Sequence, residues 1–303
     1  MERNDDVTFF FEALIGGMLS GVMYSLVALG FVLIFKSSGV FNFAQGAMVL
    51  FSALTFVRLL EMHVPFGLAL VLTLLVMVLL AMAIERVVLR SLVNQPLIIL
   101  FMATIGLNFF LEGLAQGVWD NQVHGLDIGI NDVPLESLMQ ATGILVSTFD
   151  IIAALIAGTL VLGLSLFFHK TRIGRALRAV SDDHQAALSV GIPLHHIWAI
   201  TWAAAGIVAF VAGLLWGSRL GVQFSLSLIT LKALPVLILG GFNSIPGAII
   251  GGLIIGSTEK LAEFYLSRYL GSGIENFFPY LLAMGFLMLR PYGLFGDEII
   301  ERV

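Results

Sequence analysis

The longest strongly polar passage of this chain is RIGRALRAVSDDHQAALSVGI, residues 172–192. It gathers arginine, aspartate and histidine side chains within a sequence that is 59% hydrophobic. The tetrapeptide SDDH at 181–184 has the residue types of an acid–base catalyst, but a helix cap accounts for the same residues more simply. The chemistry that this passage offers is therefore hydrogen bonding and ion pairing rather than catalysis.

A short helix is predicted inside this passage. Asp182 and Gln185 have the spacing of a capping box, with Asp182 as the N-cap residue. Gly191 and then Pro193 supply the stop signal. A helix of about eight residues is too short to be stable alone in water, so something must pack against it. Its small apolar surface consists of Ala186, Ala187 and Val190. From the residues alone, the helix either docks into a groove of another protein or connects two spans and lies on its own membrane domain.

Polar side chains also recur inside an apolar segment at 97–117. A spacing of four residues places them on one stripe of a helix, and they are Thr104, Asn108, Glu112 and Gln116. Ionisable residues are costly in a bilayer and usually face a bundle interior or a cavity. The stripe lines a translocation path in one interpretation and forms an interhelical hydrogen-bond seam in the other.

Two short segments resemble each other: GVFNFAQGA at 39–47 and GGFNSIPGA at 240–248 share Gly, Phe, Asn, Gly and Ala at equal spacing. Glycine and proline at these points would break a helix, and broken helices are tolerated in membranes where the backbone faces protein or a water-filled cavity. Chance similarity is the alternative in a sequence with 32 glycines. Further candidates for lining a pathway lie beside these breaks: Asn42, Gln45, Asn243 and Ser244.

The rest of the chain is strongly apolar. Only 12% of the residues are charged and the mean hydropathy is +1.01, whereas soluble domains contain about 25% charged residues. Runs such as residues 66–84 contain no charge at all, and about 20 apolar residues cross a bilayer as a helix. We therefore predict an all-α fold, a polytopic transmembrane helical bundle.

The predicted spans follow the apolar segments 12–35, 42–60, 66–85, 97–117, 144–168, 198–218, 226–241, 247–266 and 277–290. The pair at 226–241 and 247–266 is either two short crossings or one re-entrant hairpin, which gives eight or nine spans with broken or re-entrant helices. The pattern leaves no room for a soluble domain, so one integral membrane domain is expected over 1–303. The linker at 169–196 holds the densest basic cluster and is placed in the cytoplasm.

Several classes of site are excluded by the sequence. Cysteine is absent, and the six histidines show no spacing typical of metal ligands. The net charge of −5 does not suggest nucleic-acid binding. No nucleophile–base pair and no G-x-x-x-x-G-K-[ST] loop are found, so we expect no catalytic or metal site, and no cofactor on this chain. Glu259 and Glu263, with Lys260 between them, are expected to mark a hydrated helix end.

Four motifs together resemble a known family. They are YSLVALGFVLIFKSSGVFNFAQGAM near the start, GRALRAVSDDHQAALSVGI, LGGFNSIPGAIIGGLIIG at 239–256, and RPYGLFG at 290–296. In this order they look like the inner-membrane permease of branched-chain amino acid ABC transporters, the LivH type. One departure is Gln45 and Ala47, where many relatives have histidine and glutamate, and it changes the polarity beside the expected pathway.

The resemblance implies a function and partners. The chain would be a multi-pass subunit of the bacterial inner membrane, in an importer for branched-chain or related small amino acids. Its partners would be a second homologous permease, two ATP-binding subunits that hold ATP and magnesium, and a periplasmic substrate-binding protein. The polar passage would be the coupling helix that sits in a groove of the ATPase, through Arg175, Arg178, Asp182, Gln185, Ala186, Ala187 and Gly191.

Two other interpretations stay open at this stage. Permeases that resemble this one also carry urea, short amides and other small solutes. An ion-coupled secondary transporter would need an acid or histidine near the middle of the membrane, and Glu112 lies too close to one end of its segment for that role.

Overall fold

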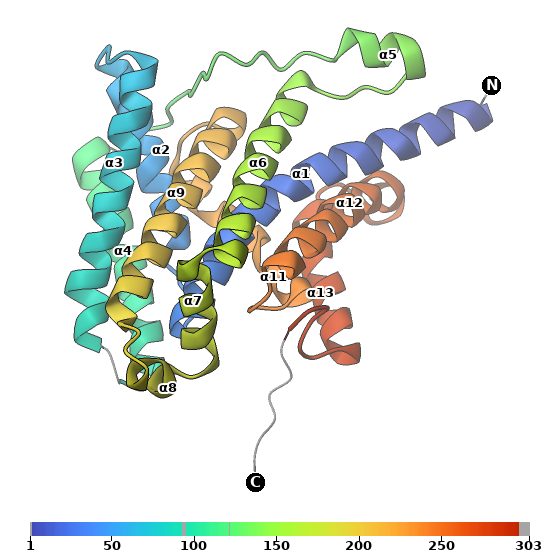
Figure 1. Cartoon of the computed structure of the whole chain (residues 1–303). Helices are drawn as coiled ribbons and strands as arrows, with labels where there is room; N and C mark the ends of the chain where they lie inside the picture. Colours follow the sequence, from blue (N-terminus) through green and yellow to red (C-terminus); the bar gives the residue numbers. More distant parts are fainter. Residues whose placement is uncertain (1, 93–94, 121, 297–303) are drawn as a thin grey trace. The chain divides into compact units, whose positions relative to one another are not determined.

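The computed structural model describes residues 2–92, 95–120 and 122–296 (Figure 1). Its α-helices are α1 Glu2–Ser38, α2 Gln45–Glu61, α3 Phe66–Ile84, α4 Leu97–Trp119, α5 Glu136–Thr142, α6 Thr148–Lys170, α7 Arg172–Asp182, α8 His184–Ser189, α9 Leu194–Leu220, α10 Ile229–Lys232, α11 Leu234–Gly240, α12 Ile245–Leu270 and α13 Phe278–Leu289. α3 continues as a π-helix, Glu85–Leu89, and a 3-10 helix, Arg90–Leu92. Over the described ranges, β-structure is limited to two isolated bridges. The all-α prediction is confirmed.

Six helices of the described part are long and apolar enough to cross a membrane. They are Val7–Ser38, Phe66–Leu92, Leu97–Trp119, Thr148–Lys170, Leu194–Leu220 and Ile245–Leu270. The chain is therefore a multi-pass membrane protein. α2 has 17 residues and α13 has 12, and the segment Phe224–Gly240 is divided into a 3-10 helix, α10 and α11. The count of eight or nine spans stays a prediction.

The described chain forms two compact units. We call the first the terminal unit, with Met1–Ala28, Gly129–Val161 and Lys232–Val303, and the second the central unit, with Leu29–Ile128 and Leu162–Leu231. The division falls within α1, α6 and α10, so each of these helices contributes to both units, and Lys232 at the end of α10 belongs to the terminal unit. All contacts discussed below lie inside a single unit.

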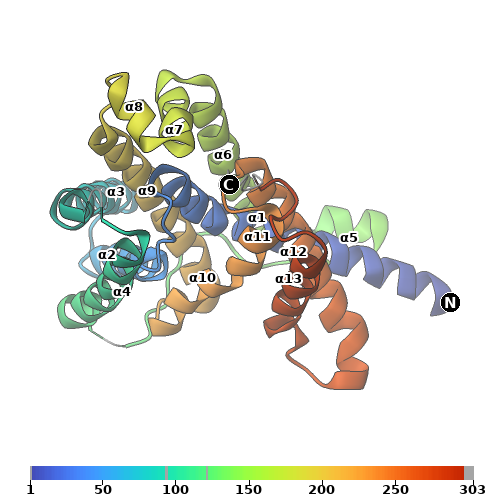
Figure 2. The same cartoon turned by 90° about the horizontal axis from the view of Figure 1, so that it is seen from below.

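The core of the central unit lies among α2, α3, α4 and α9, which are drawn together in Figure 2. Small residues let these helices approach closely, as expected where lipid removes the hydrophobic force between helices. A Cβ atom on Gly213 of α9 would lie 2.6 Å from the Val49 carbonyl oxygen of α2. Trp198 Nε1 of α9 also donates to the Ser37 carbonyl oxygen at 2.8 Å, which ties α9 to the end of α1.

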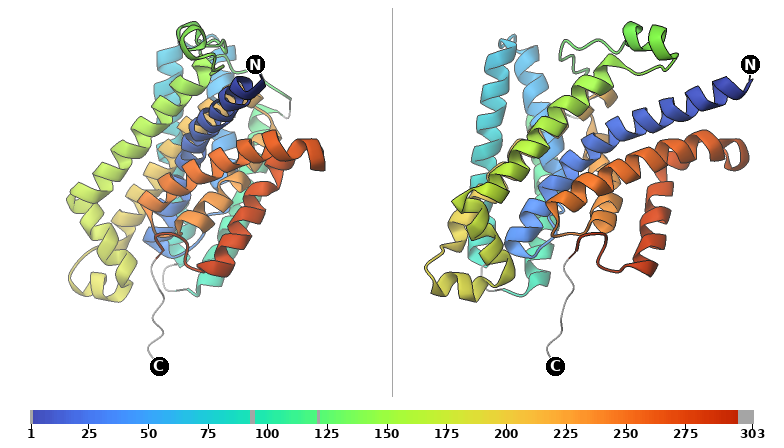
Figure 3. Two further views of the ribbon diagram at one scale, coloured as in Figure 1. Left: turned by 90° about the vertical axis from the view of Figure 1, so that its right-hand side faces the viewer. Right: turned by 45° about the vertical axis from the view of Figure 1, so that its right-hand side comes forward.

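In the terminal unit, α1 and α12 lie side by side (Figure 3). Gly17 and Gly21 of α1 face Gly252 and Gly256 of α12, each pair separated by three residues. A Cβ on Gly21 would lie 2.4 Å from the Gly252 carbonyl oxygen, so no larger residue fits there without moving a backbone. This small-residue contact fixes the position of α12 against α1.

The loop after α4 is tied to the end of α2. Arg58 donates to the Trp119 carbonyl oxygen at 2.7 Å and forms an ion pair with Asp120. The backbone N–H of Gln122, 2.9 Å from Asp120 Oδ1, and the His124 ring stabilise the carboxylate, so the pKa of Asp120 lies below its usual range. The loop therefore begins from a fixed point of the central unit.

Candidate functional site

The polar passage forms two consecutive helices, α7 and α8, which lie next to each other in Figures 1 and 2. Thr171 is the N-cap of α7, and its side-chain oxygen accepts from the Gly174 N–H at 3.2 Å. A Cβ on Gly174 would lie 1.6 Å from the Phe168 carbonyl oxygen, so only glycine fits this turn. Leu177 and Val180 are buried and hold one face of α7 against the central unit. The sequence argument singled out neither Thr171 nor Gly174.

Arg178 has a partner inside the chain. Its guanidinium donates to the carbonyl oxygens of Phe168 at 3.1 Å and His169 at 3.3 Å, which belong to the last turn of α6. These carbonyls lack intrahelical partners, so Arg178 caps the C-terminus of α6. Arg175, one turn earlier, is exposed. Of the two predicted coupling arginines, Arg175 is therefore the one available to a partner protein.

The predicted N-cap of the short helix is wrong by one residue. Asp182 is the last residue of α7, whereas Asp183 caps α8 by accepting from the N–H groups of Gln185 at 2.8 Å and Ala186 at 3.0 Å. Asp183 has the extended backbone that an N-cap requires, with φ −157° and ψ 112°. α8 comprises six residues, and Gln185 does not occupy the third helical position that a capping box requires.

The surface that α8 presents also differs from the prediction. Ala187 is only 2% exposed and faces the protein's own chain, because α8 folds back beside α7 and α9. Asp182, Gln185 and Ala186 are exposed. The large apolar side chains that remain open to a partner are Leu188, 47% exposed, and Val190, 75% exposed. Gly191 has a φ of +84°, which confirms it as the stop residue.

The first helix break, residues 39–44, lies between α1 and α2 in the central unit. Asn42 Oδ1 accepts from the Ala44 N–H at 3.1 Å, and its amide group donates to Gln45 Oε1 at 3.4 Å. Gln45 Nε2 in turn donates to the Ala205 carbonyl oxygen of α9 at 3.4 Å. Both predicted pathway residues are fully buried. In this conformation their hydrogen bonds hold the break itself.

The second break, residues 241–244, lies between α11 and α12 in the terminal unit. Ser244 is the N-cap of α12 and accepts from the Gly247 N–H at 3.0 Å. Asn243 is half-buried. A Cβ on Gly247 would lie 2.1 Å from the Gly240 carbonyl oxygen, and one on Gly46 would lie 2.4 Å from the Ser227 carbonyl oxygen. The two similar segments are both helix breaks, with a glycine packed against backbone at the same place.

The polar stripe of α4 changes its surroundings along the helix. Thr104 is buried and accepts from the Phe43 N–H at 3.3 Å, and its hydroxyl shares its proton between the carbonyl oxygens of Phe101 at 2.8 Å and Phe41 at 3.2 Å. Asn108 and Glu112 are half-buried, and Gln116 is exposed. A four-residue spacing advances about 40° per step around a helix with 3.6 residues per turn, so the stripe leaves the buried face. Thr104 thus ties α4 to the first break, and pathway lining by Asn108 and Glu112 stays a prediction.

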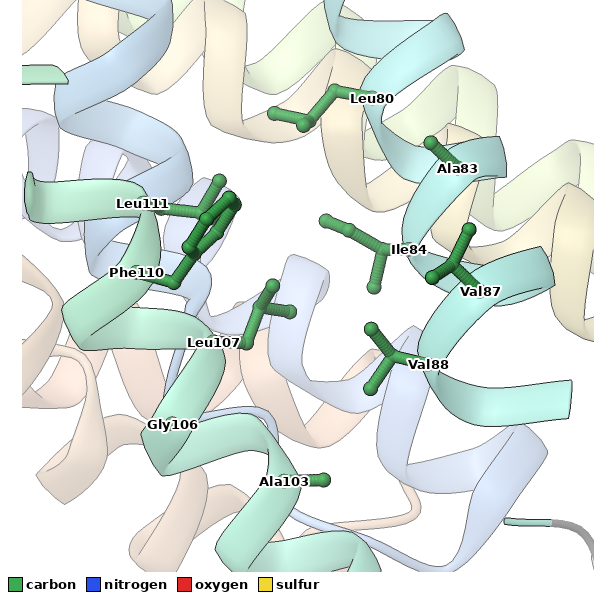
Figure 4. A pocket seen from close by; sticks show the side chains of 10 residues that line it. All are labelled: Leu80, Ala83, Ile84, Val87, Val88, Ala103, Gly106, Leu107, Phe110 and Leu111. Atoms are coloured by element: carbon green, nitrogen blue, oxygen red, sulfur yellow. The ribbon is translucent and has the colours of Figure 1, made fainter. Parts of the chain in front are cut away.

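A groove between α3 and α4 encloses about 400 Å³ (Figure 4). The ten residues that line it are all apolar: Leu80, Ala83, Ile84, Val87, Val88, Ala103, Gly106, Leu107, Phe110 and Leu111. A polar solute would find no hydrogen-bonding side chain among them. The groove suits hydrocarbon and is not a site for an amino acid.

Glu259 departs from the hydrated helix end that was expected. It is 2% exposed, and its Oε1 accepts from Lys232 Nζ at 3.1 Å and from the Tyr24 hydroxyl at 3.2 Å. Glu263 accepts from the N–H groups of Gly273 and Glu275 in the turn that follows α12. The sequence argument missed Lys232, whose signal was a lone charge within a long apolar segment.

Comparison with known proteins gives these features a context. A protein family described as "Branched-chain amino acid transport system / permease component" matches residues 13–289. The chain is 28% identical to the high-affinity branched-chain amino acid transport system permease protein LivH of Escherichia coli, over 99% of this chain and 100% of that protein. It is 29% identical to the permease protein BraD of Pseudomonas aeruginosa, over 98% and 99% of the two chains. It is 31% identical to a probable branched-chain amino acid transport permease protein LivH of Methanocaldococcus jannaschii, over 93% and 91%.

Proposed function

Because the chain belongs to the family of permease components of branched-chain amino acid transport systems, we propose that it imports a branched-chain or related small amino acid as the membrane subunit of an ATP-driven transporter. The match over nearly the whole length of these relatives supports the proposal. The chain would lie in the bacterial inner membrane. It would pair with a second homologous permease, two ATP-binding subunits and a periplasmic substrate-binding protein, with ATP and magnesium held by the ATP-binding subunits.

The observation that carries the coupling role is the surface of α7 and α8. Leu188 on α8 and Val190, which follows the last residue of α8, are exposed apolar side chains outside the predicted spans. Exposed Gln185 lies on the same helix, and exposed Arg175 lies on α7, which packs against α8. Apolar anchors with a polar rim are the pattern of a protein–protein interface. We assign this surface to the groove of an ATP-binding subunit.

The contacts of α7 and α8 with the neighbouring spans support a role in transmitting movement from the ATP-binding subunit. Arg178 bonds the last carbonyls of α6, and Gly174 brings α7 into backbone contact with Phe168. A displacement of α7 by the ATPase would therefore move the end of α6 with it. Because α8 packs beside the start of α9, the same displacement would reach α9. Alternating access would follow from the linked movement of these two spans.

Val190→Asp tests the docking surface. Val190 is 75% exposed, so the change should alter the stability of the permease by only about 0.5 kcal/mol or less. It should place a charge in the proposed apolar contact, release the ATP-binding subunits and abolish uptake. The measurement is copurification of the ATP-binding subunits from membranes, together with amino-acid uptake. Val133→Asp is the matched control, since Val133 is 52% exposed in the loop before α5, and it should retain the ATP-binding subunits. A Val190→Asp permease that keeps its ATPase and transports normally contradicts the assignment.

The substrate is tested on the assembled transporter with its own binding protein. ATP-dependent uptake of radiolabelled leucine, isoleucine and valine should be found, and an excess of urea or acetamide should not compete. Uptake of urea without uptake of the amino acids would contradict the substrate proposed here, while it would leave the transport role intact.

A further inference from the structure

Lys232 is an isolated charge in an apolar part of the chain. No other aspartate, glutamate, lysine or arginine occurs between Arg219 and Glu259. The segment that carries it is broken into a 3-10 helix, Phe224–Leu228, followed by α10 and α11. Broken backbone at membrane depth is tolerated only where it is buried in protein or lines a water-filled cavity. Ionisable residues inside a membrane domain are costly, and they usually face its interior or a water-filled cavity.

The partner of Lys232 is the next charged residue along the chain. Lys232 Nζ lies 3.1 Å from Glu259 Oε1, and the Tyr24 hydroxyl donates to the same oxygen at 3.2 Å. The other oxygen, Glu259 Oε2, is buried and has no hydrogen-bond partner among the described residues. Removing a carboxylate from water is costly unless a counter-charge lies beside it. Glu259 therefore requires Lys232 in order to remain charged.

The two members of the pair differ in how far the rest of the chain covers them. The Glu259 side chain is 3% exposed, whereas the Lys232 side chain is 23% exposed. An ammonium group has three N–H donors, and Lys232 uses one of them on Glu259 in the described structure. The remaining donors are available to a ligand that reaches the accessible side of Lys232. That ligand must be an acceptor, and an anionic one forms the strongest bond.

We propose that Lys232, positioned by Glu259 and Tyr24, binds the carboxylate of the amino acid during its passage through the permease. The identity of the cargo rests on the function proposed above. Glu259 balances the lysine when the site is empty, so no unpaired charge is left inside the membrane domain. Its competition for the ammonium group also keeps the bond to the cargo weak enough for release, as a conducting site requires.

The alternative is an ion pair that only stabilises the packing of Lys232 against α12 inside the terminal unit. The double variant Lys232→Met/Glu259→Gln separates the two roles, because it removes both charges and leaves neither one buried alone. If Lys232 binds the cargo, the double variant should assemble and melt close to the wild type, yet import leucine about tenfold more slowly per assembled complex, the factor of a charge-assisted hydrogen bond. ATP hydrolysis driven by the liganded binding protein should continue. Normal leucine uptake by this variant overturns the proposal.

A second measurement covers the case in which the double variant does not assemble. The chain has no cysteine, so Lys232→Cys can be modified at that position alone within this subunit. Treatment with 2-aminoethyl methanethiosulfonate attaches an ammonium group through a disulfide, with methanesulfinate as the leaving group. Methyl methanethiosulfonate reacts in the same way and attaches a neutral methylthio group. Uptake is measured per assembled complex, because an ion pair that is only structural would change assembly and melting temperature rather than the uptake of each assembled complex. Recovery of leucine uptake per assembled complex with the aminoethyl reagent alone supports the proposal, and equal uptake per complex after both treatments overturns it. The wild-type complex, treated in parallel, accounts for cysteines of the partner subunits.

Failure of the cargo assignment gives a different result. If the wild-type complex imports urea and no amino acid, the proposed substrate is wrong. If it imports leucine and the Lys232 variants do so equally well, the substrate stands and the role of Lys232 is wrong.

Discussion

The two helix breaks have nearly the same sequence but secure their polar side chains in different ways. In the first break, Asn42 is fully buried and its carboxamide replaces a helix cap by accepting from the Ala44 N–H. In the second break, the equivalent Asn243 is half-buried, and Ser244 caps α12. Ser244 takes the position that Phe43 holds in the first break. The side chain that accepts from the backbone thus lies one residue further along the second segment than in the first.

The glycine at the equivalent position of the two breaks has the same role in both. Gly46 and Gly247 occupy the same place in the two segments, and each packs where a Cβ would overlap a backbone carbonyl oxygen. The contacts belong to different partners, Ser227 in the central unit and Gly240 in the terminal unit. The backbone conformation of each break thus depends on its glycine. The burial of the asparagine, complete for Asn42 and partial for Asn243, differs between the two breaks.

The largest expected effect is on the glycines that both breaks require. Gly46→Ala and Gly247→Ala should each lower the free energy of unfolding by about 3 kcal/mol, because a Cβ there would force two backbones apart. Thermal melting of the purified complex measures this loss. Gly113→Ala is the control, since a Cβ on Gly113 meets nothing within 4 Å, and it should raise stability by up to about 1 kcal/mol through helix propensity. A Gly247→Ala complex that melts like the wild type contradicts the role assigned to the glycine.

The positions of both breaks could be predicted from the sequence, because glycine and proline interrupt an apolar run wherever it occurs. The long spans could be predicted for the same reason, since length and hydropathy are local properties. The sequence could not predict which of the two adjacent aspartates, Asp182 or Asp183, caps α8. That choice depends on where α7 ends, and the end of α7 is set by the burial of Leu177 and Val180 against the rest of the central unit.

The candidate sites depend even more on tertiary contacts. Ala187 has the same local sequence whether it faces a partner or its own chain, and only the packing of α8 beside α9 decides between them. Glu259 finds its counter-charge at Lys232, 27 residues away. Spacing along a helix predicts pairs three or four residues apart, so a pair formed between two helices leaves no periodic signal. A lone charge in an apolar segment was the signal that the sequence did contain.

A smaller effect should distinguish the asparagines of the two breaks. Asn42→Leu leaves the buried Ala44 N–H and Gln45 Oε1 without the partners that Asn42 provides, which should cost about 2 kcal/mol. Asn243→Leu should cost less, because Asn243 is half-buried and water can replace lost hydrogen bonds. Melting temperatures of the two variants, compared in the same detergent, give the order. Equal falls in melting temperature would show that burial does not make the hydrogen bonds of Asn42 more costly to lose than those of Asn243.

The smallest effect concerns the cap that the first break lacks. Ser244→Ala removes the acceptor of the Gly247 N–H in the first turn of α12 and should cost about 1 kcal/mol, whereas Ser244→Gly should cost only a few tenths, since glycine is itself tolerated at an N-cap. Ser267→Ala, near the other end of the same helix, changes the same side chain without removing a cap and should leave the melting temperature unchanged or slightly higher. The rank order Ser244→Ala, Ser244→Gly, Ser267→Ala therefore tests the cap itself rather than the loss of a hydroxyl group. If Ser244→Ala and Ser267→Ala melt at the same temperature, the hydroxyl of Ser244 does not stabilise α12, and the second break is held by its packing without the side-chain hydrogen bonds that hold the first.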